Sequence, residues 1–208
     1  MKMSIHRALG ELKTLEKRIN KEIENGIFIG AKKSSSETEY KTRTSIQDFK
    51  NNVKSTEQSI NDLIKRRKEI KEAIVNSNAN TFVTIGDNKM TVASAIERKT
   101  SIEYDRFLLS KMKEQYRYTI SFVEENNEEV ESDLSNKIDI MLNTNDKKNT
   151  EGIEQFSKAY RKSNGWEVVD VIDLKSLIDK LEKEITIFEN EVDVVLSESN
   201  ATTFIDIE

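Results

Sequence analysis

The sequence contains no cysteine, no proline, one histidine and one tryptophan among its 208 residues. Without cysteine, disulfides, thiolate catalysis and zinc–thiolate sites are excluded. Without proline, nothing chemically forces a helix to kink, so long helices are permitted. A single imidazole, His6, excludes a metal site built on two histidines within one chain, and its place near the start of a helix is typical of an exposed residue.

Long apolar runs are also missing. No stretch reaches the roughly 18 consecutive apolar residues of a membrane-spanning helix, and the N-terminus has no apolar segment of the kind found in signal peptides. We therefore expect no membrane partner, and a location in the cytoplasm. With 36% apolar and 34% charged residues, the composition suits elongated helices with a narrow buried stripe better than a compact globule.

Charge is unevenly distributed along the chain. Residues 1–100 carry 20 Lys/Arg against 13 Asp/Glu, whereas residues 101–208 carry 13 against 25. One interpretation is that basic early helices pack beside acidic later ones, and the other is a basic face for a phosphate-bearing partner. The net charge of −5 argues against binding to duplex nucleic acid, which depends on many phosphate contacts.

Apolar residues at three- and four-residue spacing predict helices at about 4–25, 45–76, 92–142, 151–163 and 171–197, with a long loop over 26–44. Ser45 and Asp48 fit a capping box at the start of the second helix, and Asp170 is placed to cap the last one. The second and last helices carry coiled-coil-like seams that need partners, either each other or a second chain. Whether the third helix continues through Glu124–Glu129 stays open.

An internal repeat points to a small sheet. Asn78–Ile85, NANTFVTI, returns as Asn200–Ile207, NATTFIDI, after another helical segment. We expect strands at about 81–86, 89–93 and 202–207, with Asp87-Asn88 as the hairpin loop. This register places Ile85 opposite Met90 and Val83 opposite Val92, with Ile205 and Ile207 on the same apolar face.

The predicted fold is thus mainly α: an elongated antiparallel helical bundle or coiled coil in a single domain, residues 1–208. A small three-stranded β-sheet, the hairpin plus the C-terminal strand, lies at one end. A two-stranded hairpin alone is marginal in water, which gives the last residues a reason to return to it.

The long loop is the first candidate binding site. Gly26–Ser34 resembles a P-loop only loosely, because three residues instead of four separate its glycines and it follows a helix instead of a strand. Flexible donors in this loop could still surround an anion. The candidate ligands are Lys32, Lys33, Ser34, Lys41 and Arg43, and the alternative is an ordinary solvated loop.

The second candidate lies at the end of the short fourth helix. Tyr160, Arg161, Lys162 and Trp166 join two aromatic rings and two cations beside a turn, which suits stacking on a base and pairing with a phosphate. The alternative is that the two rings fasten the short helix to its neighbour. Acid pairs such as Glu124/Glu125 are typical of a solvated helix face, so we expect no metal site, no cofactor and no catalytic residue.

Three segments carry a resemblance to known proteins. SIHRALGELKTLEKRI and EVDVVLSESNATTFIDI, near the two ends of the sequence, resemble an uncharacterised family of phage and prophage proteins. TFVTIGDNKMTVASAIERK is similar to the hairpin-plus-long-helix plan of a related bacterial family of unknown function. The resemblance implies antiparallel helices with a β-hairpin and a phage setting, either in the bacterial host cell or in the virion, and it brings no catalytic residues.

Together these features predict a non-enzymatic phage-encoded binding protein that forms a homo-oligomer. It would sequester a nucleotide-like anion, most concretely a nucleotide immune signal of the host, or a host or phage protein. The alternative is a coiled-coil structural or assembly component of a virion. A third hypothesis, a carboxylate-metal enzyme, would require tight binding of Mg²⁺ or Mn²⁺.

Overall fold

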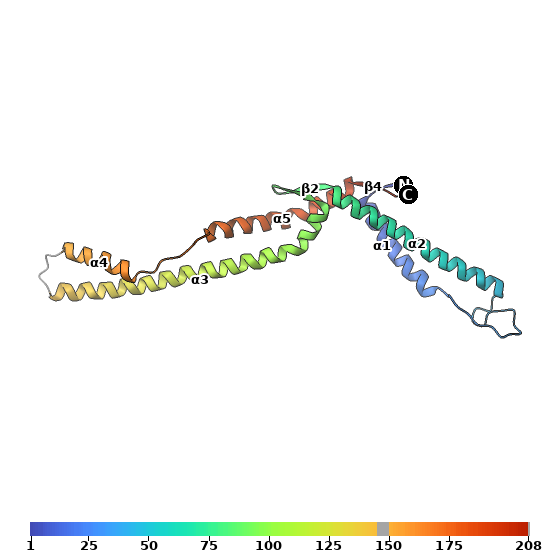
Figure 1. Cartoon of the computed structure of the whole chain (residues 1–208), viewed down its shortest axis with the longest axis horizontal. Coiled ribbons are helices and arrows are strands. Elements are labelled where there is room, and N and C mark those ends of the chain that lie inside the picture. The colour runs from blue at the N-terminus through green and yellow to red at the C-terminus, as the bar shows by residue number, and fades with distance from the viewer. Residues whose placement is uncertain (145–149, 208) are drawn as a thin grey trace. The chain divides into compact units, whose positions relative to one another are not determined.

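The computed structural model describes residues 1–144 and 150–207 and is mainly helical, as predicted (Figure 1). Its described residues cluster into two compact units, which we call the sheet unit (residues 1–100 and 187–207) and the α4 unit (residues 101–186). The finer prediction of a bundle or coiled coil stays a prediction. In chain order the elements are β1 (Lys2–Ser4), α1 (Ile5–Asn25), α2 (Ile46–Asn80), β2 (Phe82–Ile85), β3 (Asn88–Thr91), α3 (Val92–Thr144), α4 (Thr150–Asn164), α5 (Leu174–Thr202) and β4 (Phe204–Asp206).

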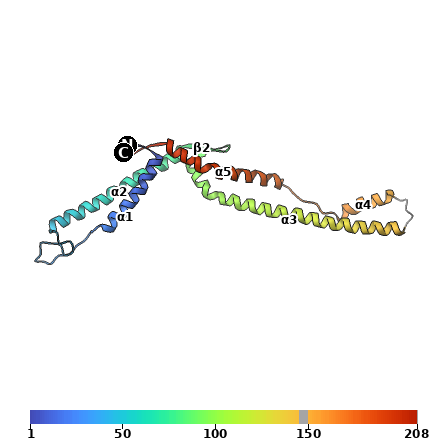
Figure 2. The ribbon, with the colours of Figure 1, turned by 180° about the vertical axis from the view of Figure 1, so that it is seen from behind.

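The first two helices begin at serine caps. The Ser4 hydroxyl accepts a hydrogen bond from the backbone N–H of Arg7, and the Ser45 hydroxyl accepts one from that of Asp48 at 3.1 Å. This confirms the serine half of the predicted capping box, while the Asp48 carboxylate accepts the Ser45 hydroxyl at 2.7 Å instead of a backbone amide. α1 and α2 pack side by side, as both ribbon views show (Figures 1 and 2). α2 runs four residues past its predicted end, to Asn80, so the first residues of the Asn78–Ile85 repeat are helical.

The predicted three-stranded sheet is wrong. The structure has two separate two-stranded sheets, because β4 pairs antiparallel with β1 instead of joining the β2–β3 hairpin. β1 was missed because a strand of three residues carries almost no periodic signal. It suits β4 well, since Met3 lies opposite Ile205 on the buried face and Lys2 lies opposite Asp206.

The predicted hairpin register is also wrong. Val83 lies opposite Met90 and Ile85 opposite Asn88, so Gly86 and Asp87 form the two-residue loop. Gly86 has φ +56°, a conformation that glycine adopts without strain and that the first loop residue of a type II′ turn requires.

Two equivalent halves emerge from this strand pairing. The first runs from β1 through α1 and α2 to β2, and the second runs from β3 through α3, α4 and α5 to β4. Each sheet combines the first strand of one half with the last strand of the other. Lys2-Met3-Ser4-Ile5 therefore corresponds to Lys89-Met90-Thr91-Val92, as the Asn78–Ile85 repeat corresponds to Asn200–Ile207.

The hydrogen bonds at the two sheets repeat this correspondence. The carbonyl of Thr203 accepts the N–H of Ile5 at 3.0 Å, and the carbonyl of Thr81 accepts the N–H of Val92 at 2.9 Å. A lysine ammonium lies over a phenylalanine ring in each sheet, Lys2 over Phe204 and Lys89 over Phe82. Each helix that follows then buries an alanine completely, Ala8 in α1 and Ala95 in α3.

One contact differs in chemistry between the halves. Glu11 of α1 pairs with Arg66 of α2 at 3.2 Å, and at the corresponding place Arg98 of α3 lies over the ring of Phe188 of α5. An ion pair in one half is thus replaced by a cation–π contact in the other.

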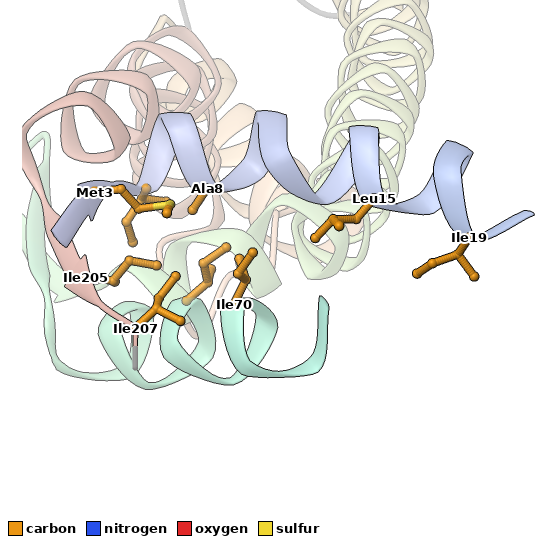
Figure 3. Close-up of a cluster of buried hydrophobic side chains, with 9 residues drawn as sticks. Met3, Ala8, Leu15, Ile19, Ile70, Ile205 and Ile207 are labelled. Carbon is orange, nitrogen blue, oxygen red and sulfur yellow. The ribbon is translucent and has the colours of Figure 1, made fainter. Parts of the chain in front are cut away.

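The core of the sheet unit lies between α1, α2 and the β1–β4 sheet (Figure 3). Ile205 and Ile207 point from the C-terminal strand toward Ile70 of α2, while Met3 and Ala8 close the cluster from β1 and α1. All five side chains are buried, so the ends of the described chain are held by apolar packing as well as by strand pairing.

In the α4 unit, α3 is one helix that runs without interruption through Glu124–Glu129. α5 begins at Leu174, three residues after its predicted start, because Asp170 caps it from a distance: the Asp170 carboxylate accepts the N–H of Leu174 at 2.8 Å. Leu134 of α3 and Ile178 of α5 are among the buried residues of this unit.

Candidate binding surfaces

The loop between α1 and α2, residues 26–45, is folded around a buried acid, and we call it the tip loop. The Glu39 carboxylate accepts hydrogen bonds from the Ala31 N–H at 3.2 Å, the Thr42 N–H at 2.6 Å and the Thr42 hydroxyl at 2.9 Å. These bonds, with that from the Thr42 N–H the strongest, hold the pKa of Glu39 below its ordinary value although burial opposes them. The interior of the tip loop is therefore anionic at neutral pH.

The predicted anion ligands of this loop all lie on its exposed surface. The Lys32 ammonium donates to the Ser36 carbonyl at 3.0 Å, and the Arg43 guanidinium lies 5.4 Å from the centre of the Tyr40 ring. A groove of about 330 Å³ opens beside them. Of the predicted set it is lined by Lys32 alone, together with Gly30, Ala31, Glu39, Ile46, Phe49 and Lys50, so the loop does not gather its cations around one hollow.

The second predicted site is tied to α3 by ion pairs. The Arg161 guanidinium donates twice to the Glu131 carboxylate, at 2.6 and 2.8 Å, and the Tyr160 hydroxyl donates to Asp133, which also pairs with Lys137. The hydrogen bond from Arg161 lowers the pKa of Glu131 and raises that of Arg161. The bond from Lys137 likewise lowers the pKa of Asp133. Arg161 and Tyr160 are thus engaged within the chain.

Trp166 is fastened to the same stretch of α3. Its ring meets Phe122 edge to face, with centroids 5.1 Å apart. The Asn127 side chain binds the Trp166 backbone twice, accepting its N–H and donating to its carbonyl, both at 2.9 Å. These contacts match the alternative drawn from the sequence, that the rings fasten α4 to its neighbour. Lys162 stays exposed in the last turn of α4.

The two predicted groups belong to different units, the tip loop to the sheet unit and residues 160–166 to the α4 unit. The ligand-binding role of each group stays a prediction.

A groove between α3 and α5 was not foreseen from the sequence. It has a volume of about 450 Å³ and lies within the α4 unit. Two of its lysines are compensated by carboxylates, Lys113 by Glu182 at 2.6 Å and Lys175 by Asp179 at 2.8 Å. The hydrogen bond that Lys175 donates to Asp179 raises the pKa of Lys175. The remaining lining residues are Tyr116, Arg117 and Ile178.

Sequence reasoning also missed an exposed apolar face on α3. Tyr104, Phe107, Leu108 and Tyr118 recur at helical spacing on one side of the helix, and we call them the outer face of α3. Tyr104 and Phe107 expose 78% and 76% of their surface. The signal was present in the sequence as a second apolar stripe beside the one of Leu109, Met112 and Tyr116, but a stripe does not reveal whether a partner covers it.

The segment between α4 and α5 is exposed and apolar as well. Residues 167–173, with the sequence EVVDVID, connect the two helices, and we call them the valine segment. Residues 171–172 form a bend, at which the Ile172 N–H donates to the Asp170 carboxylate at 3.1 Å. Val169 and Val171 are each 88% exposed. The backbone N–H groups of residues 167–171 make no hydrogen bond to any described residue, so the stretch before the bend, residues 167–170, is open to pairing with another extended chain.

No protein-family model, curated protein or solved structure matches this chain. Among the described residues, no three His, Cys, Asp or Glu side chains are grouped so that they could hold a metal ion. None of the helices, as far as they are described, is both long enough and apolar enough to cross a bilayer.

Proposed function

We propose that this chain is a non-enzymatic phage-encoded binding protein that oligomerises and sequesters a partner. The partner that its surfaces suit best is a host or phage protein that packs on the outer face of α3. The phage setting rests on the sequence resemblance alone. The main support for this partner is that α3 exposes apolar side chains along one side, those of Tyr104, Phe107, Leu108 and Tyr118.

The energetic argument is the cost of leaving such a face in water. Covering a large aromatic side chain contributes about 2 kcal/mol per ring through the hydrophobic effect. Aligned apolar groups at three- and four-residue spacing are the pattern by which one helix docks on another helix or in a groove. Exposed apolar patches of this kind mark interaction sites more often than isolated apolar residues do.

Site-specific photo-cross-linking in phage-infected cells tests the proposal. A photoreactive amino acid replaces Tyr104 or Phe107, and the matched control replaces Glu124, an exposed residue of the same helix. We expect a discrete adduct with one host or phage protein at the first two positions and none at the control. Adducts no more abundant than at Glu124 would refute the role of the outer face.

The nucleotide form of the proposal rests on the cations of the tip loop. Calorimetry of the folded protein against cyclic and linear nucleotides tests it, with the Lys32→Glu/Lys33→Glu variant as the matched control. Heat with the natural chain that the variant lacks would support sequestration of a nucleotide, whereas no heat with any nucleotide would exclude it.

The virion component is the second candidate, favoured by the 53-residue length of α3 with its exposed outer face. Mass spectrometry of purified particles distinguishes it. Stoichiometric presence of the chain would support a structural role, and absence would remove it.

A further inference from the structure

We infer that this chain self-associates head to tail, with residues 167–170 of the valine segment of one molecule pairing as a β-strand with residues 27–30 of the tip loop of a second copy. This inference rests on the oligomerisation in the proposed function and names its interface. Two stretches whose backbone groups make no hydrogen bond to the described residues, 27–30 and 167–170, carry it.

The tip loop offers the first partner strand. Ile27, Phe28 and Ile29 are exposed, Ile29 by 86%, and the backbone groups of residues 27–30 make no hydrogen bond to the described residues. Lys32 and Lys33 follow directly. This stretch is therefore apolar, extended and basic at its end.

The valine segment has the complementary character. Its four β-branched residues are exposed, and Glu167, Asp170 and Asp173 give it an acidic edge. β-Branched residues favour strands, and an open strand edge is a template for another extended chain. Pairing with the tip loop would satisfy the free backbone groups of both segments and cover apolar residues on both.

Charge distinguishes between the two possible pairing partners of the valine segment, which are the same segment and the tip loop of a second copy. Pairing of the valine segment with the same segment of a second copy would bring acidic residues against acidic residues, which is unfavourable. Pairing with residues 27–30 places Lys32 and Lys33, which follow directly, beside these acids instead. Each molecule carries one segment of each kind, so the contact is heterologous and generates a ring or a filament.

The test uses two full-length variants, each altered at strongly exposed positions so that the monomer fold is spared. The loop variant is Ile29→Asp, and the segment variant is Val169→Lys/Val171→Lys. The matched control is Val194→Lys, since Val194 is an exposed valine of α5 outside both segments. Far-ultraviolet circular dichroism verifies that all three fold like the natural chain.

Sedimentation velocity gives the first readout. The natural chain should form assemblies larger than a dimer that weaken as salt is added, and Val194→Lys should behave in the same way. Each of the two variants should associate at least about tenfold more weakly. An equimolar mixture of the two should stop at a dimer, because only one intact loop and one intact segment remain to pair.

Hydrogen exchange gives the second readout. In the natural chain, the amides of residues 167–171 should gain protection as the protein concentration rises. They should lose that protection in the loop variant, in which the valine segment itself is unaltered.

The outcomes separate the interface from the proposed function. If the natural chain associates and both variants associate equally well, this interface is wrong while oligomerisation stands. A natural chain that is monomeric at all concentrations refutes the interface and the oligomerisation together, and leaves the outer face of α3 to be judged by cross-linking.

Discussion

Substituting Ile205 by alanine should destabilise the sheet unit strongly. Ile205 lies in the middle of β4, is only 5% exposed, and packs in the cluster that contains Met3, Ile70 and Ile207 (Figure 3). Removing three methyl or methylene groups from such a site leaves a cavity that the surrounding side chains fill only in part. We therefore expect a loss of about 3 kcal/mol in the free energy of unfolding, within the ~2–5 kcal/mol typical of buried Ile→Ala changes.

Thermal unfolding followed by circular dichroism measures this loss. For a chain of this size, 1 kcal/mol corresponds to roughly 2–4 °C, so the melting temperature should fall by roughly 6–12 °C. The matched control is Asp206→Ala in the same strand, where the side chain is exposed on the other face and the change should stay within about 0.5 kcal/mol.

The comparison of the two variants decides the matter. If Ile205→Ala melted like Asp206→Ala, β4 would not be packed against α1 and α2, and the pairing of β4 with β1 would be refuted with it. The same measurement on Val83→Ala, the corresponding residue of the β2–β3 sheet, should show a smaller loss of about 1.5 kcal/mol because fewer carbon atoms are removed.

Three further predictions concern other parts of the chain. Gly86→Ala should cost about 1–2 kcal/mol in a denaturant melt, because φ is +56° and the new Cβ would lie 2.7 Å from the Ile187 side chain; an unchanged midpoint would contradict the turn. Asn127→Ala should red-shift the fluorescence of Trp166, since two hydrogen bonds to its backbone are lost, and an unshifted spectrum would count against this clamp. Because the pKa of Glu131 is lowered in the folded chain, its ionised form stabilises the docking of α4 at pH values above the unfolded pKa, and this stabilisation is lost as the pH falls through the folded pKa. Glu131→Gln should therefore flatten the acid limb of a pH titration followed by Trp166 fluorescence, and an identical acid limb in the variant would disprove the linkage.

The helices could be predicted because their signals are local. Ser45 caps α2 through a hydrogen bond three residues away, and the apolar positions of α2 such as Ile60, Ile70 and Ile74 recur at helical spacing and are buried. Ends were less predictable. The sequence predicts that α2 ends at about residue 76, but the helix continues to Asn80. Asp170 caps α5 across a bend at residues 171–172 instead of directly preceding its first residue.

The strand pairing could not be predicted because it depends on contacts that are distant in the sequence. The NA(N/T)TF(V/I)xI repeat led to the expectation that its two occurrences lie in one sheet, whereas each pairs with a different first strand. The missing signal was in the sequence all along: Lys2-Met3-Ser4-Ile5 returns as Lys89-Met90-Thr91-Val92. Two short repeats together indicate two halves, but only the register shows that they exchange strands.

The sequence showed which residues of the candidate sites have suitable side chains, but not which other side chains surround them in the fold. Arg161 and Tyr160 have the chemistry to hold a nucleotide, but Glu131 and Asp133 of α3 already engage them. No local pattern shows such compensation, because the acids lie about 30 residues away in the sequence. The same limit hid the outer face of α3, since exposure depends on what the rest of the fold covers.

Because the two halves exchange strands, the pairing of the β-strands does not depend on the length of the helices between them. Both sheets are completed by residues at the ends of each half, so the segment between those ends can grow or shrink without altering either register. The chain already illustrates this, with a folded loop between α1 and α2 but an additional helix, α4, between α3 and α5. Helical hairpins of other lengths could therefore be grafted between the same strands, which makes the paired sheets a modular connector for extended helices.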